Sequence, residues 1–167
     1  MKRLIAAAGL FVLALGLMPG RASANIIYTF SGVTFDDGGT LAGTFTTNDA
    51  RNALIDYDLL TSGGTLVGFH YTPAGTVSFS SLPAILVVET AALDHLLEVT
   101  FNGGLTATGA PITIGAFDSF EQVPGGTHRA ITAGSAIVRA AVPEPATMTL
   151  AGFGLLGLVV AQRRRRS

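Results

Sequence analysis

Histidines, acids and serines are the residues of this chain that could do chemistry, because it contains no cysteine. The lack of cysteine excludes thiol catalysis, metal–thiolate sites and disulfides. His70, His95 and His128 are the only histidines, and none stands at a metal-ligand spacing from another histidine or a carboxylate motif. No Gly-x-Ser-x-Gly nucleophile elbow occurs. We therefore predict no catalytic residue and no cofactor. A triad or carboxylate pair assembled only by the fold is the enzymatic alternative, a hydrolase.

Each histidine has a simple local interpretation. His70 lies between two aromatic residues, and alternation along a strand would turn it away from them toward solvent. Asp94 directly precedes His95, where we expect a local hydrogen bond and not a catalytic pair. His128 and Arg129 follow a Gly-Gly turn, so both are expected to be exposed.

Two pairs of acids are weak candidates for metal binding. Asp56 and Asp58 would share one face of a strand, and Asp36 and Asp37 occupy a predicted turn. Carboxylate oxygens of this kind bind calcium, but no EF-hand spacing accompanies them, and solvated acids are the commoner outcome. We predict no metal site, with Asp56 and Asp58 as the weak candidates.

The middle of the chain has the residue pattern of antiparallel strands. Short runs rich in β-branched and aromatic residues alternate with polar ones, as in residues 40–47, 55–59, 76–80 and 97–101. Gly-Gly pairs at 38–39, 63–64, 103–104 and 125–126 supply turns. We predict an all-β fold, an antiparallel β-sandwich of jelly-roll type, with a barrel as the competing fold. Most aromatic residues should fill the core of this fold. Residues 89–97 could form a short helix in place of a strand.

Charge is distributed unevenly along the chain. Residues 25–141 hold three arginines, no lysine and ten acids, a formal charge of −7, whereas the other basic residues stand at the two ends. A domain with so little positive charge cannot neutralise phosphates, so nucleic-acid binding is excluded.

Both ends of the chain carry targeting features. Lys2 and Arg3, an apolar stretch over residues 4–18 and a cleavage site with Ala22 and Ala24 predict a signal peptide over residues 1–24. It would be read by the secretion translocon and cut by signal peptidase. Residues 25–141 would then form the β-domain.

The carboxy-terminal segment, residues 142–167, has three parts in order. The motif Pro143, Glu144 and Pro145 comes first, then an apolar run over residues 148–161, then a basic cluster of Arg163, Arg164, Arg165 and Arg166. The apolar run predicts a single transmembrane helix, and the arginines should hold its end in the cytoplasm. Its run of about 15 residues is short for a span, so the anchor in the inner membrane is expected to be transient.

This arrangement resembles the sorting signal of PEP-CTERM proteins. The resemblance implies export in a Gram-negative bacterium, processing by the membrane enzyme exosortase, and a final place at the cell surface or in an extracellular matrix of exopolysaccharide or biofilm. The two targeting signals, the acidic domain and the lack of a catalytic motif together favour a noncatalytic surface protein. A carbohydrate-binding module for matrix polysaccharide, using outward aromatic rings with Asp56 and Asp58 and calcium, is the alternative.

Overall fold

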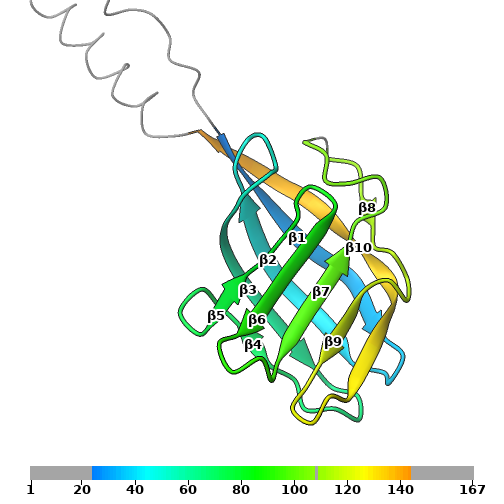
Figure 1. Cartoon of the computed structure of the whole chain (residues 1–167). Helices are drawn as coiled ribbons and strands as arrows, with labels where there is room; N and C mark the ends of the chain where they lie inside the picture. The colour runs from blue at the N-terminus through cyan, green and yellow to red at the C-terminus, as the bar shows by residue number, and fades with distance from the viewer. Residues whose placement is uncertain (1–23, 108, 144–167) are drawn as a thin grey trace, which may run out of the picture. The chain divides into compact units, whose positions relative to one another are not determined.

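A computed structural model describes residues 24–107 and 109–143, which contain ten strands and, within those ranges, no helix (Figure 1). The strands are β1 (Ala24–Phe35), β2 (Thr40–Thr47), β3 (Leu54–Ser62), β4 (His70–Tyr71), β5 (Thr76–Ser78), β6 (Ile85–Thr90), β7 (Leu96–Thr100), β8 (Ile112–Thr113), β9 (Phe120–Gln122) and β10 (His128–Pro143). Residues Ala24–Val142 form one compact unit. The prediction of an all-β antiparallel fold is confirmed.

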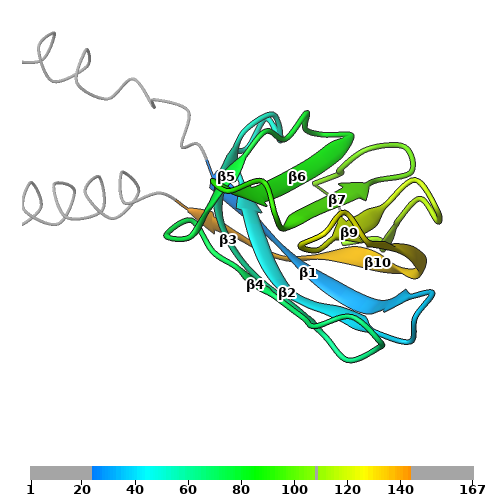
Figure 2. The same ribbon diagram turned by 60° about the horizontal axis from the view of Figure 1, so that its bottom comes forward.

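The strands follow one hydrogen-bonded path that folds over into two layers. Its order is β4, β3, β2, β1, β10, β9, β7, β6 and β5, and β8 pairs with β10 beside the path. Figure 2 shows β1 to β4 in one layer, with β6, β7 and β9 in the other. The long strand β10 continues from one layer into the other. Neighbours in the path are mostly neighbours in sequence, so the jelly-roll order predicted from the sequence is not found among these strands.

A close crossing of β1 and β10 accompanies this change of layer. The register of β1 with β2 shifts between Thr29 and Val33. Opposite this bulge, Gly134 has a φ of 134°, and a Cβ atom there would lie 2.6 Å from the Cα of Val33. Only glycine allows the two backbones to approach so closely.

The core lies between the layers and is rich in aromatic rings. Phe45 stacks on Tyr28, with ring centroids 4.9 Å apart, and on Phe101 of the opposite layer at 5.6 Å. Aliphatic side chains from β6 and β7, including Leu86 and Leu97, are fully buried beside them. The expectation that most aromatic residues fill the core is confirmed, and Phe79 and Phe117 are exposed exceptions.

The segment predicted as a possible helix is a tight turn instead. Residues 91–95 join β6 to β7, where Thr90 exchanges backbone contacts with His95 and Leu93. Leu93 has a φ of 57°, which ends any helical path. The helix prediction was wrong because the pairing of β6 with β7 determines this segment more strongly than its local helix propensity.

The two ends of the compact unit lie at the same end of the fold. β1 and β10 are neighbours in the sheet path, and Thr34 and Asp36 of the first segment contact Thr132 and Ala130 of the second. This antiparallel order places the start of β1 beside the end of β10 (Figure 1). No helix in residues 24–107 and 109–143 could span a membrane. The predicted signal peptide and transmembrane helix lie outside the described residues.

Candidate functional site

A buried ion pair between β9 and β10 forms the centre of the site. Arg129 and Glu121 face each other in the strand register, and both side chains are wholly buried. Arg129 Nε donates a 2.7 Å hydrogen bond to Glu121 Oε2, and Nη2 lies 2.6 Å from the same oxygen. The expectation that Arg129 is exposed was wrong. Its side chain shares the inward face of β10 with that of Ile131, whereas His128 faces solvent as predicted.

Two hydroxyl groups from the opposite layer donate hydrogen bonds to Glu121. Thr61 Oγ1 on β3 donates to Oε1 at 2.7 Å, and Tyr71 Oη on β4 donates to the same atom at 2.9 Å. Burial, reinforced by the neighbouring charge of Glu121, raises the pKa of Tyr71 far above its usual range. The tyrosine therefore stays a neutral hydrogen-bond donor. These contacts link the two layers of the fold.

Asp37, in the turn between β1 and β2, caps the outer side of the guanidinium. Arg129 Nη1 lies 3.2 Å from Asp37 Oδ2 and donates a 2.9 Å hydrogen bond to the carbonyl of Gly63. Burial on its own would raise the pKa of Asp37, but hydrogen bonds from the Gly39 and Leu66 amides and the charge of Arg129 lower it to about 2. Asp37 is therefore ionised at neutral pH.

Two glycines leave room for this network, and one aromatic ring packs against it. A Cβ atom on Gly39 would lie 2.3 Å from Arg129 Nη1, and one on Gly64 would lie 2.3 Å from Asp37 Oδ2. The guanidinium carbon lies 4.3 Å from the centroid of the Phe35 ring, within cation–π distance. Two of the four Gly-Gly turns recognised in the sequence thus line the ion pair.

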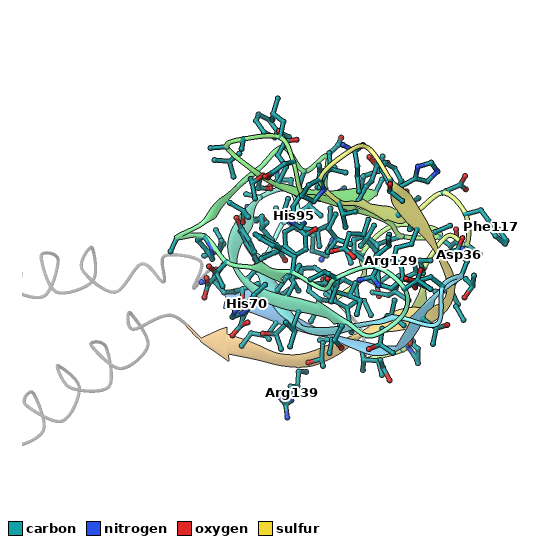
Figure 3. The ribbon with its side chains drawn as sticks, turned by 90° about the horizontal axis from the view of Figure 1, so that it is seen from below. Asp36, His70, His95, Phe117, Arg129 and Arg139 are labelled. Atoms are coloured by element: carbon teal, nitrogen blue, oxygen red, sulfur yellow. The ribbon has the colours of Figure 1, made fainter. Side chains whose placement is uncertain are left out.

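An open pocket of about 240 Å³ lies over the outer end of the network. It forms where the turn after β1, the loop after β3 and the start of β10 meet. Its lining residues are Asp36, Asp37, Thr65, Leu66, Thr127, His128 and Arg129. Figure 3 shows Asp36 at the rim of the domain and Arg129 further inside.

The histidines singled out in the sequence lie in separate surroundings. His70 is exposed on β4, as predicted, and its Nε2 lies 2.6 Å from Asp58 Oδ1. His95 stacks on Phe69, with ring centroids 4.0 Å apart. The local hydrogen bond expected at Asp94 exists, but its partner is the Thr90 hydroxyl, which lowers the pKa of Asp94.

The weak metal candidates make other contacts. Asp58 is paired with His70, and Asp56 Oδ1 accepts a hydrogen bond from the backbone amide of Tyr57. Both carboxylates are exposed on β3. Within residues 24–107 and 109–143, no three potential ligands come close enough together to hold a metal ion. The calcium-assisted carbohydrate site predicted around these two acids therefore gains no support from their contacts.

Sequence reasoning missed the pairing of Glu121 with Arg129, although a signal existed. The residues have opposite charges and stand four positions on either side of Gly125 in a Gly-Gly turn. A hairpin centred there brings them face to face, and the strand register does so. Ala22, Glu144, Pro145 and the arginines at 163–166 lie outside the described residues, so the structure gives no account of them.

Comparison with known proteins identifies the carboxy-terminal segment. Residues 141–166 match the family model of the PEP-CTERM protein-sorting motif. Neither the curated proteins nor the solved structures include a significant match to the chain.

Proposed function

We propose that this chain, which carries a PEP-CTERM protein-sorting motif, is a noncatalytic protein of the bacterial cell surface or extracellular matrix. The match over residues 141–166 carries the proposal. The motif implies export, sorting to the cell surface and exosortase as the processing partner. We extend this proposal from the cell surface to the extracellular matrix, where the protein would belong to a biofilm or exopolysaccharide layer.

The two ends of the chain supply the steps of delivery. The signal peptide, residues 1–24, directs the chain to the translocon, and signal peptidase cuts after Ala24. The apolar run then stops in the inner membrane, because the arginines at 163–166 resist transfer and remain cytoplasmic. Proline fixes its own φ and restricts the residue before it, so the sequence of Pro143, Glu144 and Pro145 favours an extended segment, which suits recognition by a membrane enzyme. Exosortase processing releases the β-domain to the surface.

A noncatalytic role agrees with how the buried charges of the β-domain are used. Arg129 and Glu121 are occupied by each other and by internal hydroxyl and carbonyl groups. The exposed imidazole of His70 is paired with an exposed aspartate on the outer face of β3. These contacts join strands, and they suit a stable structural domain. The formal charge of −7 over residues 25–141 keeps such a domain soluble.

Processing of the tail tests the proposal directly. In the wild-type cell, intact-mass analysis should find a mature protein that has lost both residues 1–24 and the arginines at 163–166. Replacing Pro143, Glu144 and Pro145 by alanines should leave an unprocessed, membrane-bound protein. The wild-type chain in a strain without exosortase should give the same unprocessed species and serves as the matched control. A mature wild-type protein that still carries Arg166 would overturn the proposal.

A further inference from the structure

The pocket beside Asp36 lies at a junction of three chain segments and is built on fixed charges. Asp36 and Asp37 come from the turn after β1 and Thr65 from the loop after β3, while Thr127 directly precedes β10 and His128 begins it. Beneath them Arg129 and Glu121 hold these segments together. At about 240 Å³ the pocket is smaller than the roughly 300–1,000 Å³ of drug-sized sites, so it suits one ring-sized group of a larger molecule.

The charge of this pocket favours a cation. Arg129 is neutralised from the inside by Glu121, and Asp37 is saturated by the guanidinium and by backbone amides. Asp36 is exposed, and its Oδ1 accepts a 3.1 Å hydrogen bond from the Ala130 amide, the one hydrogen bond of this carboxylate among residues 24–107 and 109–143. A carboxylate has about four lone-pair sites, so Asp36 keeps acceptors for a ligand. The formal charges of Arg129, Glu121, Asp37 and Asp36 sum to −2, and the surrounding domain is also negative, which disfavours polyanions.

An exposed aromatic ring stands across β10 from Asp36. The Asp36 amide donates to the carbonyl of Ala130, and the Phe117 amide donates to that of the next residue, Ile131. Successive carbonyls of a strand point to opposite sides, so the two residues flank β10 at a separation of about two strand spacings, or roughly 10 Å. Phe117 is 74% exposed and points outward at the same end of the domain as Asp36 (Figure 3). Aromatic faces bind apolar ring surfaces and attract cations.

We propose that the pocket and Phe117 together bind a sugar chain that carries ammonium groups, that is, a polysaccharide of amino sugars with free amines. An ammonium group would be held by Asp36, ring hydroxyls would bond to the hydroxyls of Thr65 and Thr127, and a neighbouring ring would stack on Phe117. The inference adds a ligand class to the proposed function and rests on it for the extracellular setting. It also places carbohydrate recognition away from Asp56 and Asp58.

Binding by the full chain in detergent tests the inference. Calorimetric titration with the hexamer of β-1,4-linked glucosamine should show saturable binding, and the fully N-acetylated hexamer should bind at least about tenfold more weakly. Asp36→Asn should weaken binding of the glucosamine hexamer about tenfold, and Phe117→Ala several-fold. Asp56→Asn and Phe79→Ala remove an exposed carboxylate and an exposed ring elsewhere, and they should leave binding unchanged.

Several results would overturn the inference. These are no binding of the hexamer, equal binding of its acetylated form, equal loss in Asp56→Asn and Asp36→Asn, or equally tight binding of spermine, which has amines but no rings. Thermal unfolding checks that each variant is folded. If Asp36→Asn does not fold, the comparison of Phe117→Ala with its control Phe79→Ala decides whether the inference holds. If binding fails while the tail is processed normally in the wild-type cell, only this inference is overturned. If the full chain binds normally but the wild-type cell leaves the tail unprocessed, only the proposed function is overturned.

Discussion

Arg129 Nε lies 2.7 Å from Glu121 Oε2, and neither side chain is accessible to solvent. Removing two charges from water costs several kcal/mol for each ion, and hydrogen bonds to their other polar atoms offset part of this cost. Here Glu121 accepts from Thr61 and Tyr71 of the other layer, and Arg129 reaches Asp37 in the first hairpin turn. The pair therefore fixes how the two layers meet at the end that carries the pocket.

Breaking this pair should destabilise the protein strongly. Arg129→Met leaves Glu121 buried without its counter-charge, and we expect the free energy of unfolding to fall by about 3–5 kcal/mol. Urea unfolding, followed by the near-ultraviolet circular dichroism of the buried tyrosines, measures the change. Arg139→Met, on the exposed part of β10, is the control and should change stability by less than about 0.5 kcal/mol. A similar small effect in both variants would show that the pair is not formed as described.

Acid should remove the contribution of Asp37. Its pKa in the folded protein is lowered to about 2, from an unfolded value near 3.9. The carboxylate therefore stabilises the fold fully above about pH 5, and this contribution is lost as pH falls from about 4 to 2. Wild type should be more stable than Asp37→Asn at pH 6, and the difference should shrink toward pH 2. Asp49→Asn, exposed in a loop, should show no such convergence. A gap between wild type and Asp37→Asn that stays constant down to pH 2 would contradict the prediction.

The predictable part of the fold is the part that local patterns determine. The alternating run over residues 40–47 has the same bounds as β2, in which Leu41 and Phe45 are buried and Thr40 is exposed. The Gly-Gly pairs marked real turns, since Gly38, Gly63, Gly103 and Gly125 all have positive φ. Strands β6 and β9 were missed. β6 is an apolar run without clear alternation, and β9 has only three residues.

The unpredicted part depends on contacts between distant residues. From its sequence neighbours alone, Arg129 resembles a solvated turn residue. Its burial depends on Glu121, which in turn accepts a hydrogen bond from Thr61, 60 residues before Glu121. The pocket likewise needs the turn after β1 and the start of β10 to meet, more than 90 residues apart. A hairpin centred on Gly125 would have predicted the pairing of Arg129 with Glu121. No local pattern predicts that the turn after β1 meets the start of β10.

Adding a methyl group at Gly134 should disturb the crossing of β1 and β10. A Cβ there would lie 2.6 Å from both the Cα and the Cγ2 of Val33, and the φ of 134° is unfavourable for any side chain. We expect Gly134→Ala to lower the free energy of unfolding by about 2 kcal/mol or more. Gly75→Ala is the control, because a Cβ at Gly75 would meet nothing within 4 Å. Thermal unfolding of the two variants measures the difference, and equal midpoints would show that the strands do not cross as closely as described.

Alkali should weaken the link between Tyr71 and Glu121. Burial raises the pKa of Tyr71 in the folded protein, whereas the unfolded phenol titrates near pH 10. Because the folded-state pKa is the higher one, the contribution of Tyr71 is fully present below about pH 10 and is lost as pH rises further. At pH 7, Tyr71→Phe should cost about 1.5–3 kcal/mol, since Glu121 loses a donor. The stability gap between wild type and Tyr71→Phe, measured in urea at pH 7 to 11, should therefore narrow above pH 10. For Val67→Ala, which truncates an exposed side chain, the gap should stay constant. A Tyr71→Phe gap that is also constant would mean that the phenol ionises equally in both states.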